Sequence, residues 1–165
     1  MIRKMAGRGH RYFAIHTVRV SITIGAPLRY VYDWSTDYRS DDWRVARPGR
    51  HPRYRVIRVN PHRVIRIRTT PGEAKERRVA VDVVRLEPPS AWHTDQIDEE
   101  DHEAVDYKLT ALSPRLTRID LFVTERWVVP VHPTRAQVRE RLMAGWDRYT
   151  RLIEARYRSG RPAKG

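Results

Sequence analysis

Alternation of apolar and polar side chains is the feature of this sequence that most restricts its fold. In residues 16–24 one parity holds a histidine and four apolar residues: His16, Val18, Val20, Ile22 and Ile24. The other parity is polar. Because successive side chains of an extended chain point to opposite sides, this pattern predicts a strand with one buried face. The strand therefore belongs to a sheet that needs a covering layer on that face.

Six further strands are expected between residues 53 and 128. Their predicted bounds are 54–59, 63–69, 75–86, 91–97, 102–112 and 116–128. Short breaks that contain Pro, Gly or Asn separate several of them, for example Asn60-Pro61-His62. Turns this short join neighbouring antiparallel strands. The pattern therefore indicates a meander of hairpins.

Helical periodicity replaces the strand pattern in two regions. After Gly25-Ala26-Pro27, apolar residues at helical spacing predict a short helix over 28–35, and a second short helix is expected from there to about Trp43. A long helix begins at the capping-box sequence Thr134-Arg-Ala-Gln137 and runs to about residue 157. Its apolar stripe is formed by Val138, Leu142, Trp146, Tyr149 and Ile153.

These elements predict one α+β domain over residues 14–158. A basic flexible tail is expected at 1–13 and a C-terminal tail at 159–165. A seven-stranded antiparallel sheet with one apolar face must be covered, and only the C-terminal helix is long enough to lie along it. We therefore expect a curved sheet, in the order β-α-α-β6-α, wrapped around that helix.

The opening of the chain resembles the helix-grip, or SRPBCC, superfamily. The resemblance lies in Val18-Arg-Val-Ser-Ile-Thr-Ile-Gly-Ala-Pro27, in Val31, in Asp37 and in Trp43, and the element order over 14–158 agrees with it. The superfamily includes START lipid-transfer domains, polyketide cyclases and dehydrases, plant pollen allergens and coenzyme-binding relatives. The resemblance implies a cavity for a hydrophobic or amphipathic small molecule. No catalytic set transfers, because function varies widely on this fold.

Three functions are compatible with these patterns. The first is binding or carriage of a lipid, isoprenoid or aromatic polyketide-like compound between the sheet and the long helix. The second is a polyketide cyclase or dehydrase-like enzyme that uses a carboxylate or a His in the pocket. The third is nucleic-acid binding by an Arg-rich surface. The carrier is the leading prediction, because no catalytic constellation stands out. No cofactor is expected, since the sequence has no Gly-rich loop that could bind a phosphate.

Two groups of residues are candidates for the site. Glu125 and His16 are the catalytic candidates, since both share parity with apolar neighbours, although a strand end that releases Glu125 to solvent beside Arg126 is the competing interpretation. Aromatic residues are the candidates for ligand contact, or else for the core: Trp34, Tyr38, Trp43, Trp92, Tyr107, Trp146 and Tyr149.

Acidic segments are expected to serve structure. The stretch 98–103 reads as a solvated hairpin tip, and the carboxylates of 37–42 as helix caps and partners of nearby Arg. They lack the spacing of a calcium loop, and the His residues lack metal-ligand spacing. We therefore expect no metal.

Charge and composition limit the partners and the location. The net charge is +13, and 29 of the 33 basic residues are Arg, spread over nearly every segment. This predicts nucleic-acid binding that is weak and non-specific. Abundant Arg with no Cys fits a heat-adapted protein, or equally a GC-rich genome.

No apolar run approaches the ~18 residues of a membrane span, and no signal-peptide segment is present, so a cytoplasmic location is expected.

Overall fold

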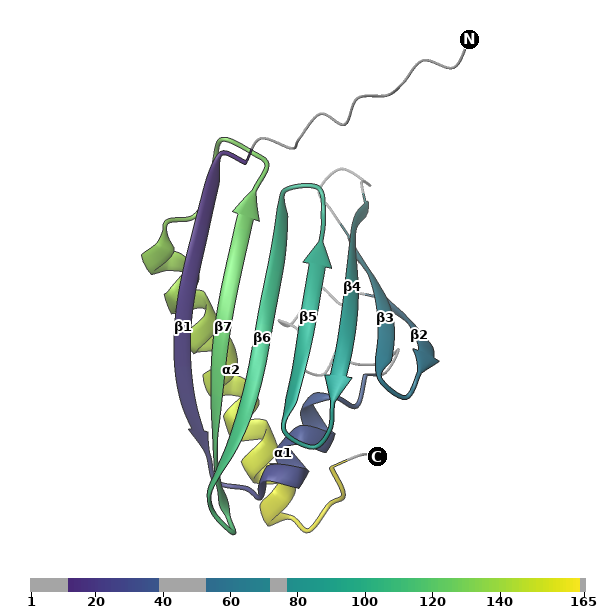
Figure 1. Cartoon of the computed structure of the whole chain (residues 1–165), viewed down its shortest axis with the longest axis vertical. Coiled ribbons are helices and arrows are strands. Elements are labelled where there is room, and N and C mark those ends of the chain that lie inside the picture. The colour runs from purple at the N-terminus through teal and green to yellow at the C-terminus, as the bar shows by residue number, and fades with distance from the viewer. Residues whose placement is uncertain (1–11, 39–52, 72–76, 164–165) are drawn as a thin grey trace.

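The computed structural model describes residues 12–38, 53–71 and 77–163, which form a sheet with helices on one side (Figure 1). Seven strands and two helices lie within these ranges. They are β1 (Ala14–Ile24), α1 (Leu28–Ser35), β2 (Arg53–Asn60), β3 (Arg63–Pro71), β4 (Arg77–Glu87), β5 (Ala91–Ile97), β6 (Asp101–Ser113), β7 (Leu116–Trp127) and α2 (Arg135–Arg158).

The seven strands form one antiparallel sheet in the order β1-β7-β6-β5-β4-β3-β2. The hairpins β2 to β7 follow the chain, whereas β1 returns to pair with β7, with Val18 opposite Val123. β1 and β2 are therefore the two edges (Figure 1). The α2 helix crosses one face of the sheet behind β1, β7 and β6 (Figure 1). The predicted seven-stranded antiparallel sheet with a long C-terminal helix is confirmed.

The core lies between this face and α2. On β7 the inward parity is buried throughout, from Ile119 through Val123 to Glu125. The α2 stripe supplies the opposing layer, since Val138 and Ile153 are fully buried. Leu142 and Tyr149 of the same stripe are only partly buried but pack against the core. The predicted apolar stripe therefore does face the sheet.

Both ends of α2 are fixed by specific hydrogen bonds. At its start the predicted capping box is present. The Thr134 hydroxyl accepts a hydrogen bond from the backbone N–H of Gln137, and the Gln137 side chain accepts one from the backbone N–H of Thr134 at 2.8 Å. Near its end Glu154 accepts a 2.7 Å hydrogen bond from the backbone N–H of Gly25, in the turn after β1. A Cβ at Gly25 would lie 3.0 Å from that carboxylate oxygen, so the contact needs a small residue.

The expected second short helix falls mainly outside the described residues. α1 ends at Ser35, and the Thr36 hydroxyl donates to the Tyr32 carbonyl at 2.8 Å, after which residues 37 and 38 are not helical. Most of the expected N-terminal tail is also outside the described ranges. The backbone N–H of Phe13 donates to the Trp127 carbonyl at 2.8 Å. Among the described residues, no helix is long and apolar enough to cross a membrane.

Candidate functional site

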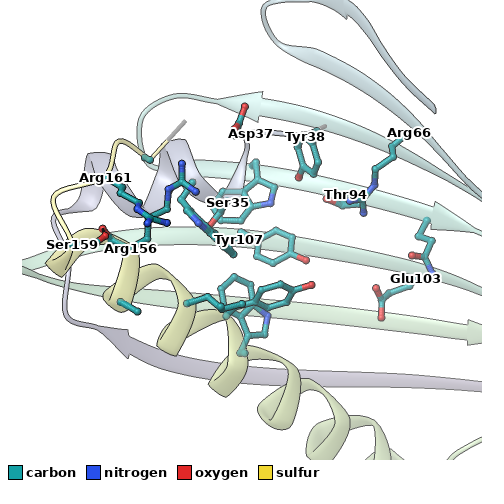
Figure 2. Close-up of a pocket in the computed structure, with 18 residues that line it drawn as sticks. Ser35, Asp37, Tyr38, Arg66, Thr94, Glu103, Tyr107, Arg156, Ser159 and Arg161 are labelled. Carbon is teal, nitrogen blue, oxygen red and sulfur yellow. Dashed lines mark hydrogen bonds between the residues drawn. The ribbon is translucent and has the colours of Figure 1, made fainter. Parts of the chain in front are cut away.

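A cavity of about 630 Å³ lies between the sheet, α1 and α2. Aromatic side chains from four elements line it: Trp34 of α1, Tyr38 after it, Trp92 of β5, Tyr107 of β6, and Trp146 and Tyr149 of α2. Figure 2 shows two of them, Tyr38 and Tyr107, among the side chains that line the cavity. The volume lies within the range typical of small-molecule sites.

The rings form a connected set with flat surfaces. Trp92 and Tyr107 stack, with centroids 4.4 Å apart and planes 11° from parallel. The ring of Trp146 lies 6.0 Å from Tyr107 and 5.4 Å from Tyr149, and Trp34 meets Tyr149 edge to face at 5.9 Å. Neighbouring rings that pack on one another hold their orientation, so the walls are rigid as well as apolar.

Polar side chains gather at the two ends of the cavity. At one end are Arg156 of α2, with Ser159 and Arg161 just beyond it, and at the opposite end are Arg66 and Glu103 (Figure 2). Arg156 is oriented by a 2.7 Å hydrogen bond from its Nε to the Pro162 carbonyl. A molecule that filled the cavity would therefore meet charge or hydrogen bonds at its ends and rings along its length.

Arg66 on β3 is held in place from two sides. Its Nε donates to Oδ2 of Asp82, which lies opposite on β4 and is fully buried, at 2.6 Å. Its guanidinium also lies over the rings of Tyr38 and Tyr54, 5.2 and 5.0 Å from their centroids. Burial alone would lower the pKa of Arg66, but Asp82 raises it above its ordinary value. The guanidinium therefore stays charged beside the rings.

Two glutamates face each other across β6 and β7. Glu103 is in register with Glu125, which is fully buried and accepts hydrogen bonds from Arg141 of α2 and, at 3.2 Å, from the Trp127 indole. The pKa of Glu103 is raised to about 8, first by burial and then by a hydrogen bond to Glu125 and the charge of Glu125. Glu103 is therefore a neutral carboxylic acid at pH 7, at the edge of the cavity.

Asp101 lies beside this pair, in a neighbouring hollow that Arg68, Asp98, Trp127 and Arg141 also line. The pKa of Asp101 is raised to about 7, first by burial and then by the charges of Asp98 and Glu125. Its Oδ1 has no hydrogen-bond partner among the described residues. The hairpin end of β6 thus places three carboxyl groups next to one arginine.

No protein-family model matches the chain, and no curated protein matches it. Solved structures do match. The di-domain ARO/CYC StfQ from the steffimycin biosynthetic pathway is similar over 90% of this chain and 53% of its own, with a TM-score of 0.66 and 15% identity. A START superfamily protein from Mycobacterium smegmatis is similar over 86% and 96%, with a TM-score of 0.55 and 13% identity. These likenesses show that the chain has the helix-grip fold.

Another helix-grip structure that matches is the Zhui aromatase/cyclase from Streptomyces sp. R1128, with a TM-score of 0.54 and 16% identity over 85% of this chain and 88% of that one. The chain spans about half the length of the di-domain proteins StfQ and BexL. At identities this low the likeness establishes the fold, so the chemistry must be argued from the residues of this chain.

Within the helix-grip fold, six of the seven aromatic candidates line the cavity, and Trp43 lies outside the described residues. Their contact with a ligand stays a prediction. Glu125 does point inward, and the alternative that the strand end releases it to solvent is wrong. It pairs with Arg141 rather than with its neighbour Arg126, because α2 passes over its side of the sheet. Glu125 is not a lining residue of the cavity.

His16 also faces inward, but it too is absent from the cavity wall. Its ring packs 5.5 Å from that of His132, and its Nε2 is buried without a hydrogen-bond partner among the described residues. His16 is the cross-strand neighbour of Glu125. The catalytic roles suggested for the two residues remain predictions.

The acidic stretch 98–103 is not a solvated tip throughout, and this expectation is corrected. Asp101 is 8% exposed and Glu103 lines the cavity, since β6 starts at Asp101 and carries them inward with Val105 and Tyr107. The sequence did hold a signal for both residues. Glu103 and Asp101 lie two and four residues before Val105, so they share the inward parity of Val105 and Tyr107. Arg66, also missed, has the parity of buried Val64.

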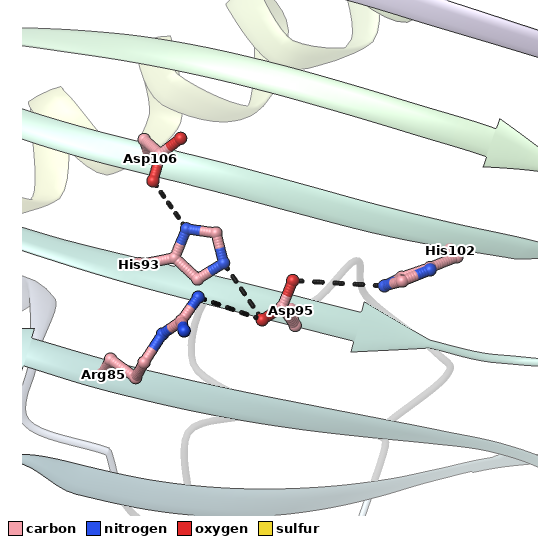
Figure 3. Close-up of polar contacts among 5 residues, drawn as sticks. All are labelled: Arg85, His93, Asp95, His102 and Asp106. Carbon is pink, nitrogen blue, oxygen red and sulfur yellow. Dashed lines mark hydrogen bonds and ion pairs between the residues drawn. The ribbon is translucent and has the colours of Figure 1, made fainter.

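The opposite face of the helix-grip sheet carries a separate polar group. His93 contacts Asp106 at 2.6 Å and Asp95 at 3.0 Å, and Asp95 also contacts Arg85 and His102, at 3.3 and 4.0 Å (Figure 3). These are side chains of adjacent strands β4, β5 and β6. In the described part of the chain no group of three or more His, Asp or Glu could hold a metal ion.

Proposed function

We propose that this protein binds a hydrophobic or amphipathic small molecule with a planar aromatic body in the cavity between the sheet and α2. The observation that carries the proposal is the cavity of about 630 Å³ walled by six aromatic side chains. Flat, rigid rings bury a large apolar area at little entropic cost and favour flat partners. Carriage of such a compound is the simplest role that this site supports.

The charges at one end of the cavity support an amphipathic ligand. Arg156 and Arg161 bring two positive charges there, against the single negative charge of Asp37. A ligand with a carboxylate or another anionic group would place that group between the guanidinium groups, which suit planar anions. Its aromatic body would then extend along the rings toward Glu103.

An enzyme of the polyketide cyclase or dehydrase type is the second candidate. Glu103 favours it, because a neutral carboxylic acid at the edge of an apolar cavity can take part in acid–base chemistry near neutral pH. Aromatase/cyclases are among the proteins that share the fold, and so is a norcoclaurine synthase solved with a transition state analogue. A carrier and an enzyme would use the same cavity, so one test addresses both.

The test is to fill the cavity by mutation and measure the binding of 1-anilinonaphthalene-8-sulfonate, an aromatic anion that fluoresces in apolar surroundings. Ala155 lines the cavity on an exposed part of α2, so Ala155→Trp should block it without disturbing the core. Ala144→Trp, at an exposed position of α2 outside this cavity, is the matched control. We expect Ala155→Trp to weaken binding at least about tenfold and Ala144→Trp to leave it unchanged. Equal binding by all three proteins would rule out the cavity as the site.

A further inference from the structure

Glu103 occupies a position at which a carboxyl group can meet a molecule in the cavity. It lies on β6 between Gln96 of β5 and Glu125 of β7, which are its cross-strand neighbours. Tyr107, four residues along the same strand, belongs to the aromatic wall. In Figure 2 Glu103 lies at the end of the cavity opposite to Arg156 and Arg161.

The hydrogen bonds to Glu125 decide which member of the pair carries a proton. Arg141 and the Trp127 indole both donate to Glu125, one to each carboxylate oxygen. Both groups are donors only, and the positive charge of Arg141 makes Glu125 the better place for the negative charge of the pair. Two carboxyl groups in one site cannot readily both ionise, so the proton of the pair belongs to Glu103.

The other charged groups around Glu103 come from several elements. Asp101 of β6 and Asp98 of the preceding turn are negative, whereas Arg66 and Arg68 of β3 and Arg141 of α2 are positive. Arg66 is neutralised by Asp82, and Arg141 by Glu125. Arg66 and Arg141 thus each have a carboxylate partner, and the proton of Glu103 adds a donor to the polar groups, such as Gln96 and Thr94, that line the cavity nearby.

We infer that Glu103 recognises a carbonyl oxygen on a planar aromatic ligand by donating its proton to it in a hydrogen bond. When such a ligand is bound, Glu125 keeps both of its other donors, so turning the Glu103 proton toward the cavity leaves neither oxygen of Glu125 without a donor. This inference rests on the proposed function, and it specifies the ligand class as aromatic ketones and related carbonyl compounds.

Xanthone and xanthene test the inference, because they share one tricyclic frame and only xanthone has a carbonyl group. Binding would be followed by quenching of tryptophan fluorescence between pH 6 and 10. For the unmodified protein we expect xanthone to bind about tenfold more tightly than xanthene at pH 6, as a hydrogen bond in an apolar cavity supplies this much. The preference should vanish as the pH rises through about 8, where Glu103 ionises.

Variants at Glu103 separate hydrogen bonding from shape. Glu103→Gln keeps an N–H donor that does not titrate, so the preference for xanthone should persist at every pH. Glu103→Leu should abolish the preference and leave xanthene binding unchanged. Glu140→Gln, on the exposed side of α2, is the control and should behave as the unmodified protein. The infrared band of protonated carboxylic acids gives a reading that needs no ligand. At pH 6 it should be weaker in Glu103→Gln than in the unmodified protein by the share of one carboxyl group, and Asp101, which is also protonated there, supplies a part that remains.

The outcomes distinguish the two proposals. If both compounds bind equally at every pH, or if the infrared band is as strong in Glu103→Gln as in the unmodified protein, the role of Glu103 is refuted while the ligand-binding function stands. If neither compound binds at any pH and 1-anilinonaphthalene-8-sulfonate also fails to bind, the proposed function itself is refuted, and the inference with it.

Discussion

Single residues of this protein decide what its cavity can recognise. Glu125 is a fully buried carboxylate whose charge is balanced by Arg141 and by the Trp127 indole. The positive charge of Arg141 is therefore used by Glu125, and Glu103, whose pKa is raised to about 8, keeps its proton at neutral pH. The ion pair between the buried Glu125 and the partly exposed Arg141 thereby favours the protonated form of a neighbouring group that faces the cavity.

The stability of the protein should fall as the pH rises toward 8, in part because of Glu103. Its pKa is 4.5 in the unfolded chain and about 8 in the folded protein, so the folded state holds a proton that the unfolded chain has lost. This contribution is fully present below pH 4.5 and is lost as the pH rises through about 8. We expect Glu103→Gln to exceed the unmodified protein in stability by on the order of 2 kcal/mol at pH 8.5, with little difference at pH 5.

Urea denaturation at the two pH values measures this effect. Asp101 acts with the same sign, since its pKa is raised to about 7, so Asp101→Asn should remove a separate part of the pH dependence. If Glu103→Gln changes stability by the same amount at pH 5 and pH 8.5, Glu103 is not protonated in the folded protein at neutral pH.

The sequence contains the parity of the polar residues that the strands bring to the site, but parity shows only which face of the sheet a side chain is on and not what surrounds it. It was sufficient to turn Glu125 inward and to place Trp92 and Tyr107 on the inner face. It could not show that Arg141, 16 residues further on, would cover Glu125, because that contact depends on how α2 crosses the sheet. The start of β6 was also missed, since acidic residues favour turns over strands and hid the inward parity of Asp101.

At the scale of elements, α2 serves both the core and the cavity. Val138 and Ile153 are fully buried against the sheet, whereas Trp146 and Tyr149 of the same stripe line the cavity. Strong periodicity made α2 and the strands predictable to within about two residues, as for β5, whose predicted and observed bounds are both 91–97. The bounds of the cavity depend on the spacing between elements, which the period of a sequence does not specify.

Truncation of the α2 stripe should be costly. Trp146 is 9% exposed and contacts the rings of both Tyr107 and Tyr149. We expect Trp146→Ala to lower the free energy of unfolding by ~3 to 5 kcal/mol, because it removes a large buried side chain. Met143→Ala, 41% exposed on the same helix, is the control and should cost less than about 1 kcal/mol. Equal melting temperatures for both variants would place Trp146 outside the core.

At the scale of the whole molecule, much of the arginine is occupied by carboxylates. Ion pairs within the described residues include Arg29 with Asp33, Arg85 with Asp95, and Arg118 with Asp120. These pairs are exposed and worth little individually. They nevertheless place a negative charge beside each of these arginines, which weakens the positive field there.

Nucleic-acid binding should accordingly be weak and dependent on salt. We expect random duplex and single-stranded DNA to bind at low ionic strength and to be released at physiological salt, with log K falling by ~0.9 per log unit of salt for each neutralised phosphate. Fluorescence anisotropy with labelled oligonucleotides measures both. Submicromolar affinity that survives physiological salt, or preference for one sequence, would place nucleic-acid recognition ahead of small-molecule binding.

The pairing of β1 with β7 has a consequence for the order in which the molecule assembles. His16 lies opposite Glu125, more than a hundred residues away along the chain, so β1 cannot find its place during synthesis until the last strand has left the ribosome. Closing so long a loop carries an entropic penalty and slows folding, whereas the hairpins from β2 to β7 can form locally. The earliest strand to be made is thus among the last to be placed, and the cavity comes into being only after α2 has been synthesised.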